Sequence, residues 1–314
     1  MIATDKFFQG ENKTYPFFEG WYFKHQIAQE VYAFIPGYSI AKNGETNPFI
    51  QVISHDHSEI FFFDSNQLFV AKNHLSIKIG ENFFSEKGLS LSLSSPNLTI
   101  MGAIDYGEFA PLKRTSYAPS IMGPFSYVPF MECYHGILSM KHSLKGNLLW
   151  NEQMIDFTGG TGYLEKDWGN SFPATYLWAQ CNQFAALDAQ FFFSAAEIPF
   201  LSGRFLGMIA VLQIDGEEYR FGTYYGAKIL DITQKEKNLV IKIRQQKLEM
   251  MIEVLKSEGH PLMAPDKGLM NRVIREKAST DITVRLQKKG KEIFNQKGKS
   301  AGFEEVGKLQ GFTY

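Results

Sequence analysis

The 314-residue sequence lacks the features that mark secreted, membrane-spanning or nucleic-acid-binding proteins. It contains two cysteines, Cys133 and Cys181, too few for a disulfide scaffold and typical of a reducing compartment. The net charge is −1, so no global field attracts nucleic acid. Residues 1–21 hold no basic region followed by an apolar run, and no stretch of about 18 apolar residues occurs. We therefore expect a cytoplasmic protein without a signal peptide, peripheral to a membrane at most.

Aromatic residues and two-residue alternation dominate what is present. Phe, Trp and Tyr make up 15% of the chain. Apolar residues alternate with polar ones from Leu75, from Leu89, over 248–254 and over 282–286. This period is typical of half-buried antiparallel strands, and breaks such as KNGE and DGEE separate the runs at hairpin spacing. About twenty strands are expected, more than one barrel usually holds.

Two interruptions divide the pattern. Residues 108–130 are irregular and proline-rich, and Gly159-Gly160 interrupts a later run. The aromatic segment that begins at Phe17 has a weak echo in the one that begins at Phe172. We expect an all-β fold of two lipocalin-like antiparallel barrels or sandwiches, residues 1–158 and 159–314. Few short helices are expected, one of them over 267–277, and each barrel could enclose an apolar ligand.

Several motifs favour ordinary structural roles. GGTGYLEK lacks the Gly-Lys-Ser/Thr ending of a phosphate loop, and no G-x-S-x-G nucleophile motif occurs. His55 and His57 could share a strand face and bind zinc, but a solvated turn is the favoured interpretation. Both cysteines read as small buried apolar residues. A basic hairpin near the C-terminus allows a transient contact with anionic membrane surfaces, although a charged edge that blocks aggregation is preferred. Its lysines are Lys288, Lys289, Lys291, Lys297 and Lys299.

Two aromatic segments carry acids. In FFEGWYF, Glu19 and Trp21 share one face of a strand, whereas Gly20 and Tyr22 share the other. The pattern fits either a pair that faces outward or a buried acid against an apolar wall. A strong alternative is that the tryptophan only closes the floor of a barrel, without a functional role for the acid. In MECYHGILSM, alternation places Glu132 and Tyr134 on one side, and Cys133 and His135 on the other. An adjacent Glu and His are candidates for proton transfer. The alternative is that the Glu lies at the rim of the barrel and the His is a core histidine whose hydrogen bonds are satisfied.

A third segment, GYLEKDWGNSFPATYLWAQCNQF, combines charges with aromatics. As a strand it puts Tyr163, Glu165 and Asp167 on one face, and Leu164, Lys166 and Trp168 on the other. After a turn, the next strand would present Trp178, Gln180 and Asn182 on one face. We expect these groups to converge across a hairpin and line a mixed pocket. A hydrogen-bonded barrel corner is the alternative.

Together these three segments resemble signature segments of the tocopherol cyclase family, and LMAPDKGLMNRVIREKASTDITVRL resembles its C-terminal portion. The resemblance implies a β-rich, lipocalin-like protein that closes a chromanol ring in a small hydrophobic prenylated hydroquinone. It implies no cofactor and no metal.

Such a ring closure needs a proton on one alkene carbon, while the phenol oxygen attacks the other. A carboxyl group that holds its proton near neutral pH costs roughly 4 kcal/mol, which burial among aromatics can supply. Amides orient the phenol, and aromatic faces stabilise the cation. The candidate acids, in order, are Asp167, Glu165, Glu132 and Glu19, with His135 as a proton relay and Lys166 paired outward. The expected substrate-binding residues are Trp21, Tyr22, Tyr134, Tyr163, Trp168, Trp178, Gln180 and Asn182.

Two other function classes stay open. A non-catalytic carrier of an isoprenoid or another hydrophobic ligand needs the same cavity but no buried acid. A related enzyme, such as a hydratase or a cyclase for another product, would use the same frame.

Overall fold

The computed structural model describes residues 5, 7–185, 188–200 and 203–309, which form two compact units. Unit 1 consists of residues 1–121, 125–172 and 262–273, and unit 2 of residues 122–124, 173–261 and 274–314. Helical structure in the described residues is limited to three 3-10 turns, η1 (Ser65–Gln67), η2 (Gly123–Tyr127) and η3 (Thr223–Tyr225). None of these turns is long and apolar enough to cross a membrane. The expected all-β class with two antiparallel sheets is confirmed.

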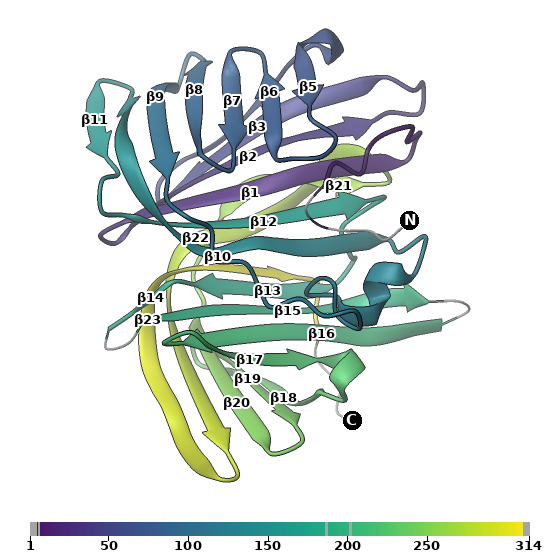
Figure 1. Cartoon of the computed structure of the whole chain (residues 1–314), viewed down its shortest axis with the longest axis vertical. Helices are drawn as coiled ribbons and strands as arrows, with labels where there is room; N and C mark the ends of the chain where they lie inside the picture. Colours follow the sequence, from purple (N-terminus) through teal and green to yellow (C-terminus); the bar gives the residue numbers. More distant parts are fainter. Residues whose placement is uncertain (1–4, 6, 186–187, 201–202, 310–314) are drawn as a thin grey trace. The chain divides into compact units, whose positions relative to one another are not determined.

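A 12-stranded antiparallel sheet forms unit 1 (Figure 1). Its hydrogen-bonded order is β4-β3-β2-β1-β12-β10-β9-β8-β7-β6-β5, and β11 pairs with β10. The strands are β1 (Phe17–Ile27), β2 (Glu30–Ile40), β3 (Thr46–Ser54), β4 (Ser58–Phe62), β5 (Leu68–Val70), β6 (Ser76–Ile79), β7 (Asn82–Ser85), β8 (Gly88–Ser94), β9 (Thr99–Tyr106), β10 (Cys133–Trp150), β11 (Gln153–Asp156) and β12 (Thr161–Gly169). Sequence neighbours pair from β1 to β4 and from β5 to β9, whereas β4 and β5 lie at opposite ends of the order. Strand β12 inserts between β1 and β10.

An 11-stranded antiparallel sheet provides the strands of unit 2, and residues 262–273 of the same sheet belong to unit 1. Its order is β17-β16-β15-β13-β23-β22-β20-β19-β18, with β14 beside β23 and β21 beside β22. The strands are β13 (Tyr176–Cys181), β14 (Gln183–Phe184), β15 (Ala189–Phe200), β16 (Gly203–Ile214), β17 (Glu217–Gly222), β18 (Lys228–Lys235), β19 (Asn238–Gln245), β20 (Leu248–Leu255), β21 (His260–Asp266), β22 (Leu269–Lys288) and β23 (Lys291–Val306).

The burial patterns explain why these segments are strands. The alternating sequence of β8, GLSLSLS, buries Leu89, Leu91 and Leu93 and leaves the last two intervening serines, Ser92 and Ser94, exposed. In contrast, β1 is buried along almost its whole length on both faces. A strand buried on both faces must satisfy any polar side chain that it carries, because an unpaired buried polar group is costly. The positions of such groups in β1 and its neighbours therefore mark a site.

Two sequence predictions about the fold need correction. The helix expected over 267–277 is instead the start of β22, where burial alternates: Val273 is 63% exposed and Ile274 is 4% exposed. In this segment, hydrogen bonding to neighbouring strands determines the structure, although the apolar residues have the spacing of a helix. The expected division at residues 158–159 falls inside unit 1, because β12 pairs with β1 and β10 of that unit.

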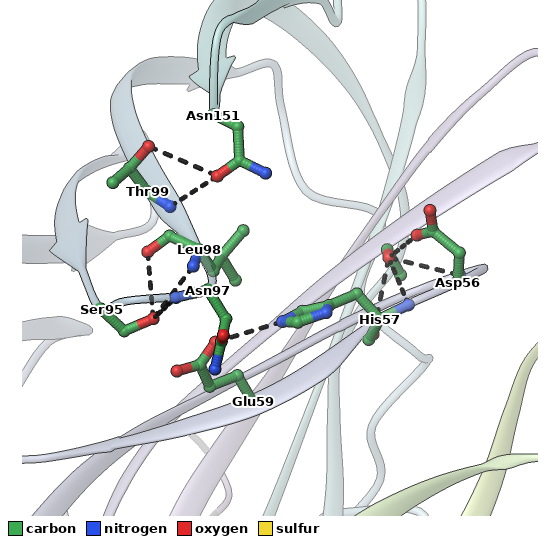
Figure 2. A network of polar contacts seen from close by, with 9 residues as sticks. Asp56, His57, Glu59, Ser95, Asn97, Leu98, Thr99 and Asn151 are labelled. Carbon is green, nitrogen blue, oxygen red and sulfur yellow. Dashed lines mark hydrogen bonds and ion pairs between the residues drawn. The ribbon is translucent and has the colours of Figure 1, made fainter.

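The segment around His57 is a turn, as favoured from the sequence. It joins β3 to β4, and the Ser54 hydroxyl accepts hydrogen bonds from the backbone amides of Asp56 (3.4 Å) and His57 (3.1 Å). Figure 2 shows the His57 ring directed to Glu59, 3.2 Å from its carboxylate. His55 is exposed beside Asp56. These contacts fix a solvated turn.

The core of unit 1 encloses a row of aromatic and imidazole rings. His25 in β1 and His142 in β10 both lie opposite Gly162 of β12, where the absent side chain leaves room for the His142 ring. The His25 Nε2 atom lies 2.7 Å from the Tyr106 hydroxyl, and the rings of Tyr106 and His142 are 4.7 Å apart. Burial lowers the pKa of His25 and of His142 from 6.5 to about 3. Both imidazoles are therefore neutral inside the folded protein.

The neutral state of these two histidines predicts that the folded protein loses stability in acid. Both histidines have folded-state pKa values below their unfolded values, so their contribution is present above pH 6.5 and is lost as pH falls towards 3. Each histidine contributes a slope of about 1.4 kcal/mol per pH unit within that window. Urea denaturation of the wild type and of His142→Asn at several pH values measures this slope, which we expect to be shallower in the variant. His74→Asn, at an exposed histidine, is the control. Equal slopes in all three proteins would contradict the prediction.

Candidate active site

Strand β12 presents two different faces. Its register places Lys166 opposite Trp21 of β1 and Gly136 of β10, on the side that packs into the apolar core of unit 1. The alternate residues of β12 point to the opposite side. Asp167 there lies opposite His135 of β10. The faces assigned to all three segments from sequence alternation are therefore confirmed by the register.

On the face away from the core, four residues form what we call the polar cluster: His135, Tyr163, Glu165 and Asp167. The His135 Nδ1 atom lies 2.8 Å from the Asp167 Oδ1 atom, and its Nε2 atom lies 3.6 Å from the Glu165 Oε2 atom. The Tyr163 hydroxyl donates a 2.5 Å hydrogen bond to Glu165 Oε2. One imidazole thus bridges two carboxylates, and a phenol supports one of them.

The polar cluster holds a proton at neutral pH. Burial alone would lower the pKa of His135, but the charges of Asp167 and then Glu165 outweigh it and raise the pKa from 6.5 to about 9. Burial and the nearby Glu165 charge raise the pKa of Tyr163 well above its usual value. The proton held at neutral pH is therefore an imidazolium proton between two carboxylates.

Cys133 borders the polar cluster, with its Sγ atom 4.0 Å from Asp167 Oδ1. Burial and then the negative charges of Asp167, Glu132 and Glu165 raise the pKa of its thiol well above the usual value. The thiol is therefore protonated and unreactive, as expected from the sequence. Both Cys133 and Cys181 are free thiols.

The core face holds a second charged group, which the sequence prediction misplaced. Lys166 does not pair outward: it is 1% exposed, and its Nζ atom lies 2.6 Å from the Glu19 Oε1 atom. The ammonium group lies 5.3 Å from the Trp21 ring and 4.9 Å from the Trp168 ring. Glu19 is therefore an ion-pair partner on the core face, on the side of β12 opposite to the polar cluster.

Residues near the N-terminus complete this ion pair, and sequence reasoning did not select them. The backbone amide of Gln9 donates to both carboxylate oxygens of Glu19 (3.0 and 3.1 Å), and Lys166 donates to the Phe7 carbonyl (2.6 Å). Asp5 lies close by and pairs with Arg114 at 2.5 Å. No sequence signal pointed to these residues, because the burial of Lys166, which requires a carboxylate and further acceptors, was itself not expected.

The remaining candidates of unit 1 lie around these two groups. Tyr22 is buried opposite Glu165, on the polar-cluster side of β1. Tyr134 stacks on Trp168 with ring centroids 5.4 Å apart, and its hydroxyl donates to the Val128 carbonyl (2.7 Å). Glu132 precedes β10, and its backbone carbonyl accepts from the amide of Asn170. Tyr22 therefore lies with the polar cluster, whereas Tyr134 and Trp168 belong to the core face.

Three other predicted binding residues lie in unit 2. Trp178 and Gln180 of β13, and Asn182 after it, alternate with Ala179 and Cys181, which face the core of that unit. Gln180 donates a 2.5 Å hydrogen bond from Nε2 to Asn182 Oδ1. The hairpin expected between this strand and residues 163–168 does not form, because β12 and β13 belong to different sheets.

The polar cluster also has the ligand types of a metal site. One ligand atom from each of His135, Glu165 and Asp167 lies within 4.8 Å of the others, and it is the only such group in the described part of the chain. An imidazole binds a metal only when neutral, so an ion would have to displace the proton of a histidine whose pKa is about 9. The two carboxylates that raise this pKa would also attract a metal ion, so the absence of a metal stays a prediction.

Sequence comparison connects the chain to one family. The family model described as "Tocopherol cyclase-like" matches residues 98–308, which include the segments around His135 and Asp167. The tocopherol cyclase of Zea mays is 23% identical over 235 residues, covering 58% of this chain and 49% of the maize protein. The chain spans no more than about half the length of the curated plant relatives that it matches.

Comparison with solved structures concerns the fold. A Nitrosomonas europaea protein described as an AttH matches with a TM-score of 0.56, 11% identity and 93% of both chains covered. Kievitone hydratase of Nectria haematococca matches with a TM-score of 0.52 and 12% identity, covering 96% of this chain and 95% of that one. Both likenesses show the lipocalin-like fold of the chain.

The buried ion pair generates a stability prediction. Lys166→Met leaves the Glu19 carboxylate buried without its partner, which we expect to lower the free energy of unfolding by about 3–5 kcal/mol. The double variant Glu19→Gln/Lys166→Met removes both charges and should recover much of this loss. Urea denaturation measures all three proteins.

The matched control is Lys297→Met, because Lys297 forms an exposed pair with Asp281 in unit 2 (2.7 Å). That change should cost less than about 1 kcal/mol. A similar small loss for Lys166→Met would show that the buried pair contributes no more than a surface pair.

Proposed function

The chain belongs to the tocopherol cyclase-like family, and from this premise we propose that it is an enzyme that closes a chromanol ring. The proposed substrate is a small hydrophobic hydroquinone that carries a prenyl chain. The polar cluster of His135, Tyr163, Glu165 and Asp167 supplies and recovers the proton. The observation that carries the proposal is the half-buried imidazole of His135, held between two carboxylates on the face of β12 away from the core.

The proposed reaction balances within the substrate and the cluster. A proton moves to the less substituted alkene carbon, and the tertiary carbon becomes electron-poor. The phenol oxygen forms the new C–O bond there, and its own proton returns to a carboxylate of the cluster. The cluster ends in its initial protonation state, so turnover consumes no other reagent.

Asp167 is the proposed proton donor, and His135 holds the proton in reserve. The 2.8 Å contact between Nδ1 and Oδ1 provides a direct path for the proton between these two side chains. Glu165 lies on the other side of the imidazole and is the proposed acceptor of the phenol proton. Tyr163 positions Glu165 through its hydrogen bond (2.5 Å).

A hydratase is the second candidate, supported by the fold shared with kievitone hydratase. Protonation of the alkene is common to both reactions, but water instead of the phenol would capture the cation. A non-catalytic carrier is the third candidate, and it has no use for the polar cluster. Product analysis separates the three: a chromanol, a tertiary alcohol, or unchanged ligand.

We predict that Asp167→Asn and His135→Gln each lower kcat on a geranylated dimethylhydroquinone at least about 100-fold, the usual size of a lost acid–base group. Chromatography of the chromanol product measures turnover, and circular dichroism checks folding. The matched control Asp281→Asn, at a surface aspartate of unit 2, should keep wild-type turnover. Wild-type rates in both cluster variants would overturn the assignment.

The pH dependence follows from the charge of His135. Its pKa is raised to about 9, so the imidazolium persists at neutral pH and the rate should fall as pH rises through 9. Glu165→Gln removes a negative charge that raises this pKa, so the alkaline limb should move to lower pH, by about one unit or more. The pH profile of residual kcat/KM measures the shift. An unmoved limb would show that His135 is not the titrating group.

Chelation tests the proton mechanism against metal catalysis. Dialysis against EDTA should leave the rate of ring closure unchanged, because the proposed steps need only protons. Loss of activity with EDTA, restored by one divalent ion, would instead assign the polar cluster to a metal.

A further inference from the structure

The outward-facing side of the unit 1 sheet carries exposed apolar side chains on strands that lie side by side (Figure 1). On strands β5 to β11, alternate residues fill the core of unit 1, whereas five large apolar residues point outward and are 37% to 63% exposed. They are Phe69 of β5, Phe83 of β7, Met101 of β9, Leu149 of β10 and Met154 of β11. The outer face of an antiparallel sheet is usually polar, so these five positions require an explanation.

Three of these residues form one continuous surface, which we call the methionine patch. Leu149 lies directly opposite Met101 of β9 on one side and directly opposite Met154 of β11 on the other. Directly opposed residues of neighbouring strands have Cβ atoms about 5 Å apart, so these three side chains lie within contact distance. Asp156 follows on the same face of β11, two residues after Met154, and is exposed. The methionine patch therefore has a negative charge at its border.

The other two residues form, together with a lysine, what we call the phenylalanine patch. Lys78 of β6 lies directly opposite Phe69 of β5 on one side and directly opposite Phe83 of β7 on the other. Lys78 is exposed, and the stem of a lysine covers apolar surface while its ammonium group stays in water. The phenylalanine patch therefore carries a positive charge at its centre.

Small side chains separate the two patches. Ser90 of β8 lies between Phe83 of β7 and Ala103 of β9, and Ser92 of β8 lies opposite Met101. Serine and alanine project little beyond the backbone, which suits the separation of about 10 Å between two sheets packed face to face.

The other charges on this face offset one another or lie at its margins. Four charged residues point outward from β5–β9, β11 and the β10 segment 145–150: Lys78, Asp105, Lys145 and Asp156. Asp105 and Lys145 lie directly opposite each other, so their charges offset. The hairpin turns at the strand ends carry Lys72, Glu81, Glu86, Lys87 and Glu152. The face therefore has one unbalanced charge of each sign, Lys78 within one patch and Asp156 beside the other.

We propose that this face binds the same face of a second copy of the chain about a two-fold axis, with the methionine patch of each copy on the phenylalanine patch of the other. This arrangement places Lys78 beside Asp156 of the partner subunit, and the symmetry repeats the pair. The opposite arrangement, with like patches together, would bring like charges together, which costs free energy. The interface does not depend on the proposed ring closure, because Leu149 and His135 lie at opposite ends of β10.

Size and charge favour a second copy over a lipid surface as the partner. The strands β5 to β11 are consecutive in the sheet and lie about 4.8 Å apart, so the face is wide enough to bury the roughly 800 Å² per partner of a stable interface. A two-fold contact covers both patches of each copy at once. An anionic lipid surface attracts clusters of several basic residues, whereas the outward charges of these strands include two of each sign.

Sedimentation equilibrium of the full chain tests for the dimer. We expect a reversible equilibrium between monomer and dimer, with the dimer predominant at about 100 μM, because interfaces of this size have dissociation constants of μM or below. A monomer at every concentration up to about 100 μM would overturn the proposal.

Charge reversal tests the proposed ion pair. Lys78→Glu and Asp156→Lys should each weaken the dimer at least about tenfold, because the symmetry makes each change act on two pairs. The double variant Lys78→Glu/Asp156→Lys restores opposite charges and should return the dissociation constant to within about threefold of the wild-type value. Lys242→Glu, at an exposed lysine of β19, is the matched control and should have no effect. A double variant as weak as the single variants would overturn the proposed arrangement.

Polar substitutions test the two patches. Phe69→Gln and Met154→Gln should each weaken the dimer about tenfold, since each removes an apolar contact twice, and circular dichroism checks that both variants fold. Val273→Gln, at an exposed apolar residue of β22, is the control. Wild-type dimerisation in both patch variants would overturn the proposal. Binding of a monomeric chain to phosphatidylcholine vesicles, lost in Met154→Gln, would also overturn it and would assign the face to a lipid surface.

Discussion

The insertion of β12 between β1 and β10 is the constraint on which both charged groups of unit 1 depend. Because a strand alternates its side chains, the sequence EKDW is divided between two environments: Lys166 and Trp168 enter the core, and Glu165 and Asp167 leave it. A register shift of one residue would exchange the two sets. The Glu19–Lys166 ion pair on one face therefore helps to fix the register that the polar cluster needs on the other.

The Glu19–Lys166 pair and the polar cluster differ in how they compensate the cost of removing charge from water. Glu19 and Lys166 neutralise each other and also bond backbone groups of Gln9 and Phe7, which leaves a satisfied structural pair. The polar cluster instead places one imidazole between two carboxyl groups, so its acidic groups outnumber its basic group. Such an excess is costly to keep for structure alone, and this imbalance is the physical reason to look for chemistry at His135.

Sequence alternation predicted much of this fold, because burial in a sheet follows the two-residue period directly. It gave the all-β class and the faces of Glu19, His135 and Asp167. Alternation could not identify ion-pair partners on strands far apart in the chain, and for this reason Lys166 was expected to pair outward. The hairpin expected after Gly169 failed for the same reason: adjacency in sequence suggested pairing, but β12 pairs with β1 and β10 in one sheet and β13 with β15 and β23 in the other.

Strand β10 carries two different sets of side chains. It contributes His135 to the polar cluster, and it contributes Leu138 and His142 to the core side of unit 1. His135 and Leu138 are three positions apart, so strand alternation alone places them on opposite faces of the sheet, and the register shift between Ile137 and Ser139 comes after His135. A bulge changes the direction of side chains without breaking the strand, so the pairing with β12 continues on both sides of it. Alternation therefore lets the polar cluster and an apolar core residue lie close together along one strand while facing opposite sides of the sheet.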